Sequence, residues 1–187
     1  PGLVRRARDA GLSGLEAVLG IPAVLGGAIA MNAGTRHGEI SDVLQEVELL
    51  VDGSVERLPA SALDLQYRRA HLPSGALLLR ARLTLTPSTP ERVAAAMAPV
   101  DAARAGQPKA TSAGCAFKNP EGDSAGRLID AAGLKGLRVG DAMVSHEHAN
   151  FIVNLGQATA ADVDALLAEV QRRVSVPLEV EWRRWGY

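Results

Sequence analysis

The 187-residue sequence has little of several residue types that mark particular classes of protein. It has one cysteine, Cys115, so no internal disulfide can form, and no Cys/His cluster has the spacing of a metal site. Aromatic residues make up only 3%, which leaves few surfaces for stacking bases, and the formal net charge is -1. We therefore expect no metal, no nucleic-acid partner and, without disulfides, a cytoplasmic protein.

The apolar run over residues 17–31 does not predict a membrane span. A spanning helix takes about 20 apolar residues, whereas this run is shorter and is interrupted by Pro22 and three glycines. We expect no membrane partner and no signal peptide. Because a helical pattern is already under way at residues 3–7, we also expect a natural N-terminal part to precede this sequence.

Among the features that are present, the clearest local one is a β-hairpin. Residues 43–51 and 54–58 have strand patterns, and Asp52-Gly53 between them is the strongest short-range hairpin signal in the chain. The overall composition, 47% apolar and 22% charged, is that of an ordinary globular protein. The length allows one core or two small domains.

A domain boundary is predicted after the third strand of this region. Residues 76–86 alternate like a strand, and residues 91–104 have a helical pattern. Pro87 and Pro90 separate the two segments. We therefore place the boundary near residues 87–90.

Three further expectations concern the N-terminal half. Ser13 and Glu16 have the spacing of a capping box for a second short helix after Gly11, and Ser61 is a cap for another. Residues 20–34 read as a loop of apolar and side-chain-poor positions. Such a loop suits a large flat ligand lying against its backbone, and it equally suits a buried turn between domains.

Strands and helices alternate in the second half. The predicted strands cover residues 115–118, 138–144, 150–154 and 177–182, and the predicted helices cover residues 125–132 and 159–174. Gly133 ends the first helix and Thr159 caps the second. This mixture favours an α+β architecture.

Cys115 lies in the stretch most suggestive of chemistry. A lone cysteine is most often a small buried hydrophobe. Here Gly114 lets a backbone or a ligand come close, and Lys118 and Asn119 add polar groups. A thiol with an unperturbed pKa of about 8.5 is protonated at neutral pH.

Several stretches together resemble the UDP-N-acetylenolpyruvoylglucosamine reductase family. The matching stretches are residues 11–16, 20–34, 67–68, 112–120, 123–130, 148–154 and 178–181. The short link 119–124 is similar to the compact subtype, and the glycine-rich N-terminal part of the flavin-binding domain is absent from this sequence. The resemblance implies part of an FAD-binding, vanillyl-alcohol-oxidase-like α+β domain over 1–89. It also implies a small α+β substrate-binding domain over 90–176 and a C-terminal strand over 177–187 returning towards the flavin domain.

The resemblance also implies an oxidoreductase of peptidoglycan synthesis that turns UDP-N-acetylglucosamine enolpyruvate into UDP-N-acetylmuramate. NADPH reduces FAD, the flavin gives hydride to the enolpyruvyl double bond, and a protein acid protonates the neighbouring carbon. Arg68, Cys115 and Glu181 match the catalytic positions, with Cys115 as the proton donor. A guanidinium suits the charge that builds up in the substrate carboxylate. These three side chains are therefore expected to line one cleft.

Binding residues follow from the same resemblance. The substrate-binding positions would be Tyr67, Lys118, Asn119, His148 and Asn150, whose donors suit phosphate and sugar oxygens. The FAD-binding positions would be Gly20, Ile21, Pro22, Gly26, Gly27, Asn32, Ala33 and Gly34.

Two alternatives stay open. The absent glycine-rich segment makes a flavin-free module that binds a UDP-sugar without catalysis the main one. A thiol-nucleophile hydrolase built on Cys115 and His148 is the weaker one, because no clear Cys-His-Asn or Cys-His-Asp pattern accompanies these residues. The oligomeric state does not follow from the sequence.

Overall fold

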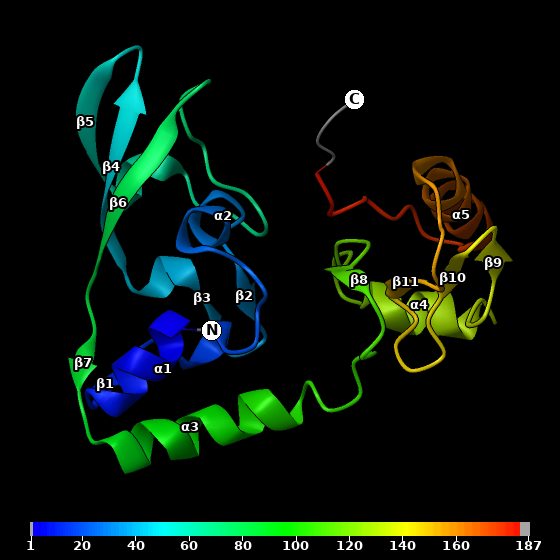
Figure 1. Ribbon diagram of the computed structural model, residues 1–187, viewed down its shortest axis with the longest axis horizontal. Helices are drawn as coiled ribbons and strands as arrows, with labels where there is room; N and C mark the ends of the chain where they lie inside the picture. The colour runs from blue at the N-terminus through cyan, green and yellow to red at the C-terminus, as the bar shows by residue number, and fades with distance from the viewer. Residues whose placement is uncertain (1, 184–187) are drawn as a thin grey trace. The chain divides into compact units, whose positions relative to one another are not determined.

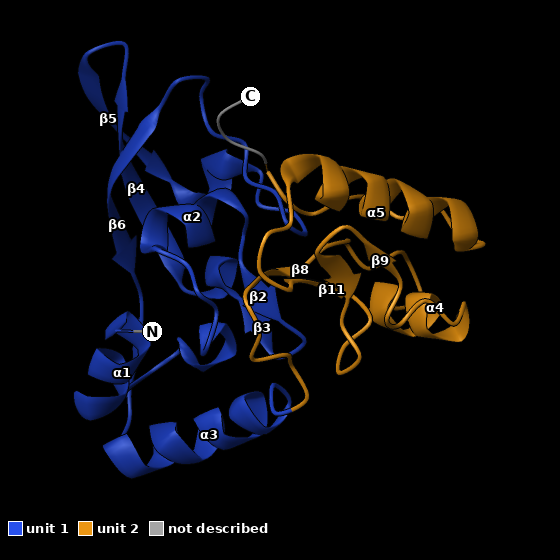
Figure 2. Ribbon diagram, turned by 45° about the vertical axis from the view of Figure 1, so that its right-hand side comes forward, with its two compact units in different colours: residues 1–105 blue, residues 106–187 orange. Residues whose placement is uncertain are grey.

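The computed structural model describes residues 2–183, and the chain divides into two compact units, unit 1 over 1–105 and unit 2 over 106–187 (Figure 2). The division falls later than the boundary predicted near residues 87–90. The helix α3, Pro90–Ala102, contacts α1 and the 3-10 turn η1, and its Val93 and Met97 enter the core of unit 1. The helix expected to open the second domain therefore belongs to unit 1.

Unit 1 is built on a three-stranded antiparallel sheet in the order β5-β4-β6 (Figure 1). The strand β4, Leu44–Val51, pairs with β5, Ser54–Pro59, and with β6, Leu77–Leu83. Asp52 and Gly53 have φ values of 47° and 81°, as a two-residue type I′ turn requires. The predicted hairpin is confirmed.

The other elements of unit 1 are short. They are α1 Gly2–Asp9, β1 Leu12–Ser13, η1 Glu16–Val18, α2 Leu25–Ala30, β2 Gly34–Thr35, β3 Gly38–Glu39, η2 Ile40–Asp42, η3 Ala60–Leu63 and β7 Thr86–Pro87. The strand β1 pairs with β7, and β2 pairs with β3. Twelve buried apolar side chains from these elements, the sheet and α3 form one core.

Two predicted helix caps of unit 1 are wrong, and the predicted loop contains a helix. Ser13 lies in β1, and the carboxylate of Glu16 accepts a hydrogen bond from the backbone N–H of Gly14, so no capping box forms. Ser61 lies inside η3, whose N-cap is Pro59. The predicted loop 20–34 contains the short helix α2, Leu25–Ala30, with which its small residues are compatible.

Unit 2 is built on a four-stranded antiparallel sheet in the order β8-β11-β10-β9. The strands are β8 Ser112–Cys115, β11 Phe151–Asn154, β10 Ala142–Val144 and β9 Arg138–Val139. The single strand predicted over 138–144 is two strands, because Gly140, at a φ of 53°, turns the chain between them. The helices α4, Ala125–Ala131, and α5, Ala160–Arg173, confirm the two predicted helices.

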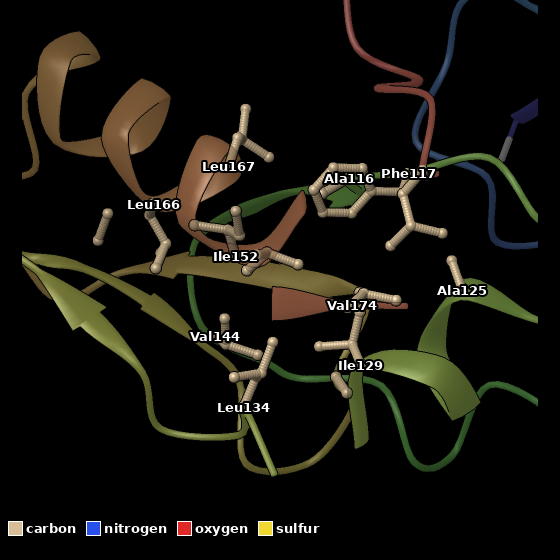
Figure 3. Packing of buried hydrophobic residues seen from close by; sticks show 14 residues of the cluster. Ala116, Phe117, Ala125, Ile129, Leu134, Val144, Ile152, Leu166, Leu167 and Val174 are labelled. Carbon is tan, nitrogen blue, oxygen red and sulfur yellow. The ribbon is translucent and has the colours of Figure 1, made fainter. Parts of the chain in front are cut away.

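Both helices of unit 2 bury apolar side chains in one core (Figure 3). Leu166, Leu167 and Val170 on α5 are at most 2% exposed, and Ile129 on α4 is 1% exposed. Thr159 caps α5 as predicted, since its hydroxyl accepts from the N–H of Asp162 while the carboxylate of Asp162 accepts from the N–H of Thr159. Unit 2 thus has an α+β architecture.

The predicted last strand, 177–182, is reduced to a single bridge between Val180 and Phe117. Two backbone hydrogen bonds flank the bridge, from the N–H of Lys118 to the carbonyl of Glu179 and from the N–H of Glu181 to the carbonyl of Ala116, each 2.8 Å long. This tail therefore lies beside the segment that follows β8, within unit 2. Of the C-terminal strand that the resemblance implies over 177–187, residues 184–187 lie outside the described residues.

Within residues 2–183, none of the helices combines the length and the apolar character that crossing a membrane requires.

Candidate functional site

Cys115 is the last residue of β8, where regular strand pairing stops. It is paired with Phe151 of β11, and the register of the two strands shifts between this pair and the pair of Ser112 with Val153. Gly114, just before it, has a φ of 84°, which favours glycine. The next residue, Ala116, donates its N–H to the carbonyl of Asn150 at 2.8 Å. The half-buried thiol thus lies between the register shift, which comes before it in β8, and the hydrogen bond of Ala116, which comes after it.

Glu181 lies beside this strand end. Its N–H is bonded to the carbonyl of Ala116, so its backbone is opposite the residue that follows Cys115. The Glu181 side chain is half-buried. The structure therefore brings two of the three predicted catalytic residues to neighbouring segments of unit 2, although they are far apart in the sequence.

Asn150 holds the segment between Cys115 and the bridge. Its side-chain Oδ1 accepts from the N–H of Phe117 at 2.9 Å, and its Nδ2 donates to the carbonyl of Phe117 at 2.8 Å. Asn150 and Phe117 are each 2% exposed. Its side-chain amide takes the place of a strand partner for the backbone of Phe117. In the structure, this predicted substrate ligand therefore positions the segment around Phe117.

Lys118 and Asn119 follow directly. The Lys118 ammonium forms an ion pair with Glu179 at 2.6 Å, and its side chain is 22% exposed. The Oδ1 of Asn119 accepts from the N–H of Ala125 at 3.0 Å, at the start of α4. Both residues follow Cys115 closely in the chain, and the ion pair fixes the Lys118 ammonium to the C-terminal tail of unit 2.

His148 precedes Asn150 and packs against Phe151, with the ring centroids 4.8 Å apart. Its Nδ1 accepts from the N–H of Asn150 at 3.2 Å. Burial lowers the pKa of His148, and the nearby charge of Lys135 lowers it further, while a backbone hydrogen bond opposes the shift. A neutral ring with Nδ1 as acceptor carries its proton on Nε2, which can donate to a ligand.

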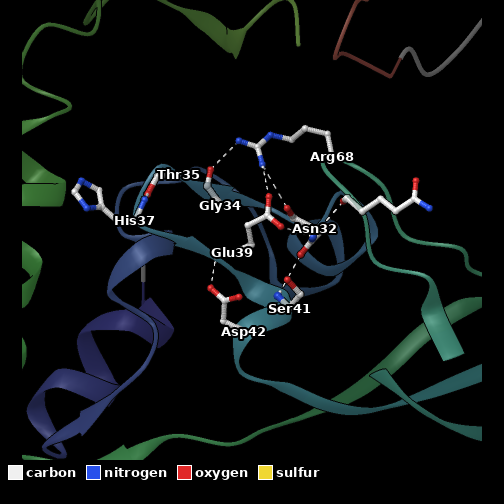
Figure 4. A network of polar contacts seen from close by, with 9 residues as sticks. Asn32, Gly34, Thr35, His37, Glu39, Ser41, Asp42 and Arg68 are labelled. Atoms are coloured by element: carbon white, nitrogen blue, oxygen red, sulfur yellow. Dashed lines mark hydrogen bonds and ion pairs between the residues drawn. The ribbon is translucent and has the colours of Figure 1, made fainter. Parts of the chain in front are cut away.

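Arg68 lies in unit 1, in a two-residue turn closed by paired hydrogen bonds between Gln66 and Arg69. Its φ of 56° is in the left-handed region, where a residue with a side chain is strained. Its guanidinium donates to the carbonyls of Gly34 at 2.9 Å and Asn32 at 3.4 Å (Figure 4). The ring of Tyr67 lies 4.7 Å from Arg68 Cζ.

Glu39 completes the surroundings of Arg68, and sequence reasoning missed it. Its Oε1 is 3.6 Å from Nη1 of Arg68, and its Oε2 accepts from Nδ2 of Asn32 at 2.7 Å (Figure 4). An isolated glutamate next to a glycine gives no sequence signal of this kind. Only the pairing of β2 with β3 brings it to the guanidinium.

The predicted FAD-binding positions fall into two groups. Gly20, Pro22 and Gly27 are exposed, Ile21 and Gly26 are partly exposed, and a side chain at Gly26 would meet nothing within 4 Å. By contrast, Asn32, Ala33 and Gly34 are buried and bonded within unit 1. The first group can present backbone to a ligand, whereas Asn32 and Gly34 of the second group accept hydrogen bonds from Arg68.

Comparisons with known proteins identify relatives of this chain. The model of the UDP-N-acetylenolpyruvoylglucosamine reductase C-terminal domain matches residues 107–184, a span that starts almost where unit 2 does. The chain is 58% identical over 185 residues to the UDP-N-acetylenolpyruvoylglucosamine reductase of Thermus thermophilus, covering 99% of this chain and 69% of that protein. It is 54% identical to the protein of that name from Deinococcus radiodurans, covering 99% of this chain and 64% of that one.

The fold is also that of a solved structure, UDP-N-acetylenolpyruvylglucosamine reductase from Thermus caldophilus. The TM-score is 0.96 at 57% identity, covering 100% of this chain and 69% of that one. All three named relatives are reductases, so the class is that of the oxidoreductases. Within this class, the chain belongs to the UDP-N-acetylenolpyruvoylglucosamine reductase family.

Proposed function

We propose that this protein reduces UDP-N-acetylglucosamine enolpyruvate to UDP-N-acetylmuramate in the cytoplasm, with FAD as cofactor and NADPH as reductant, as a step of peptidoglycan synthesis. The observation that carries the proposal is the pairing of the Cys115 strand end with the tail that bears Glu181. Family membership supports the reaction.

Unit 1 would form part of a vanillyl-alcohol-oxidase-like flavin domain, and unit 2 would bind the UDP-sugar. The backbone at Gly20, Gly26 and Gly27 fits a flat ring system, since Gly26 leaves open space beside it. When bound, FAD supplies the hydride for the enolpyruvyl double bond. Asn32, Ala33 and Gly34 would contribute to the cofactor site from behind this surface.

Arg68 would stabilise the negative charge that develops on the substrate carboxylate when the double bond is reduced. A fixed guanidinium is worth most where its position is set before the substrate arrives. Arg68 is only 16% exposed and is bonded to two carbonyls, which sets its position. Removing such a group typically costs about 10²–10³ in kcat.

Cys115 would give its proton to the substrate carbon, and Glu181 would act as an acid or orient the carboxylate next to it. A positioned general acid contributes about 10²–10⁴ in rate. The half-buried thiol at a strand end and the half-buried carboxylate on the next segment suit these two roles.

The substrate's diphosphate and sugar would be bound by Lys118, Tyr67 and the Nε2 proton of His148. Lys118 offers a charge-assisted donor, because its ammonium has three N–H groups and the contact with Glu179 uses one of them. Asn119 and Asn150 would serve mainly through the backbone segments that they hold.

The absorbance spectrum of the purified full-length protein tests the proposal. A yellow protein with bound FAD should bleach with NADPH under anaerobic conditions and regain its colour when UDP-N-acetylglucosamine enolpyruvate is added. A protein that stays colourless with added FAD, yet binds the UDP-sugar in a calorimetric titration, would instead be the flavin-free module. Covalent trapping of Cys115 by a thiol-directed analogue, without any flavin change, would indicate the hydrolase.

A further inference from the structure

Arg68 occupies a backbone conformation that needs support. Its φ of 56° is unfavourable for any residue with a Cβ, and such residues persist only where the surroundings over-determine them. Two hydrogen bonds between Gln66 and Arg69 close the turn that carries it. Contacts from outside the turn hold the guanidinium itself, from the carbonyls of Asn32 and Gly34 and from Glu39.

Those contacts form a reciprocal clamp with Asn32. Arg68 donates to the backbone carbonyl of Asn32, and Asn32 Nδ2 donates back to the carbonyl of Gln66 at 3.1 Å. The Oδ1 of Asn32 accepts from the N–H of Ser41 at 3.2 Å. Asn32 is 1% exposed and has a φ of 40°, so its amide is fixed on both sides.

Glu39 ties the clamp to the charge of Arg68. One carboxylate oxygen faces Nη1 of Arg68 and the other accepts from Nδ2 of Asn32. Glu39 is itself held independently, because β3 pairs with β2 and its N–H donates to Asp42 Oδ2 at 2.8 Å. These contacts fix the backbone of Glu39, and the hydrogen bond from Asn32 fixes its carboxylate, so the carboxylate can orient the guanidinium.

We propose that Glu39 is a positioning residue for the reductase reaction: through Asn32 and its ion pair it holds the Arg68 guanidinium where the substrate carboxylate is to be bound. This inference rests on the proposed function of Arg68. It places Glu39 outside the reacting atoms, since its two oxygens are directed at Asn32 and Arg68 (Figure 4).

The test separates the two halves of the reaction in the full-length holoenzyme by anaerobic stopped-flow absorbance. Glu39→Ala should slow flavin reoxidation by UDP-N-acetylglucosamine enolpyruvate at least tenfold and leave flavin reduction by NADPH within twofold. Glu39→Gln, which keeps an acceptor for Asn32 without the charge, should fall between Glu39→Ala and the wild type. Equal slowing of both halves would overturn the proposal.

A matched control is Glu48→Ala. Glu48, on β4 of the same unit, also pairs with arginines, Arg57 at 2.7 Å and Arg80 at 3.6 Å, and its side chain is 15% exposed. This variant should reoxidise like the wild type even if its melting temperature falls as far as that of Glu39→Ala. Slow reoxidation in Glu48→Ala would show a general stability effect and contradict a specific role for Glu39.

Two readouts distinguish a failure of this inference from a failure of the proposed function. In an Arg68→Ala background, Glu39→Ala should add less than a twofold further loss, because it acts through Arg68. Independently of turnover, the Nη signals of Arg68 in ¹⁵N NMR should be separate in the wild type and merge in Glu39→Ala as rotation speeds up. Unchanged Nη signals would overturn the positioning role, whereas a wild type that the substrate does not reoxidise would overturn only the proposed function.

Discussion

Replacing Asn150 separates a positioning residue from a substrate ligand. The change Asn150→Ala removes both partners of the Phe117 backbone, the acceptor at 2.9 Å and the donor at 2.8 Å. Phe117 is 2% exposed, so water does not readily replace them. Each unsatisfied buried group costs about 1–3 kcal/mol, so for two groups we expect a loss of about 2–6 kcal/mol in the free energy of unfolding of unit 2.

Urea unfolding followed by tryptophan fluorescence measures this loss, since both tryptophans, Trp182 and Trp185, fall in unit 2. The control is Asn154→Ala on the same strand, whose exposed Oδ1 accepts from two loop N–H groups. It should cost only about 0.5–1 kcal/mol. An Asn150→Ala protein as stable as the wild type, with a raised KM for the UDP-sugar, would refute the positioning role and favour direct substrate binding.

Three further predictions follow from local contacts. Gly34→Ala should lower the melting temperature and slow reoxidation of the flavin by substrate, because an added Cβ would lie 2.4 Å from the carbonyl of Gly38; a variant with wild-type values would contradict this. Thr159→Ala should cost about 1 kcal/mol in urea unfolding through loss of the α5 cap, with Thr159→Ser restoring most of it. The side-chain hydrogen bond from Arg127 lowers the pKa of Asp123 from 3.8 to about 2. Because the folded pKa is below the unfolded one, this pair stabilises the fold above about pH 4 and the contribution fades towards pH 2. The difference in urea midpoint between the wild type and Arg127→Gln should therefore shrink over that range, and a constant difference would exclude the ion pair as its cause.

Local signals in the sequence predicted the elements whose stability is local. The Asp52-Gly53 turn and the Thr159 cap carry their conformation in adjacent residues, so the hairpin and α5 are where the pattern placed them. These features need no information from distant parts of the chain.

Features set by tertiary contacts could not be predicted in the same way. The tail over 177–182 has a strand pattern, but it finds only the short edge around Phe117 and forms one bridge. Ser13 has the spacing of a cap, yet β1 pairs with β7 and takes it into a strand. In both cases the partner segment decides the local structure.

The candidate site divides along the same line. The residues around Cys115 were predicted from contiguous motifs, and the structure places the backbone of Glu181 beside them, while their roles stay predictions. Glu39 was missed because its link to Arg68 is made by three segments that meet only in the folded unit. The sequence predicted Asn150 as a substrate ligand, and the structure adds a contact that the sequence does not show, its pair of hydrogen bonds to the Phe117 backbone. Whether Arg68, Cys115 and Glu181 share one cleft stays a prediction.

The measurement that tests the account most directly is the anaerobic rate at which UDP-N-acetylglucosamine enolpyruvate reoxidises the reduced flavin in Cys115 variants. If Cys115 delivers the proton, Cys115→Ala should lose about 10²-fold or more in this rate, as expected for a general acid. Cys115→Ser, which keeps a proton at the same place on the strand end, should retain much of it. A Cys115→Ala protein that reoxidises and forms UDP-N-acetylmuramate at the wild-type rate would contradict the central assignment.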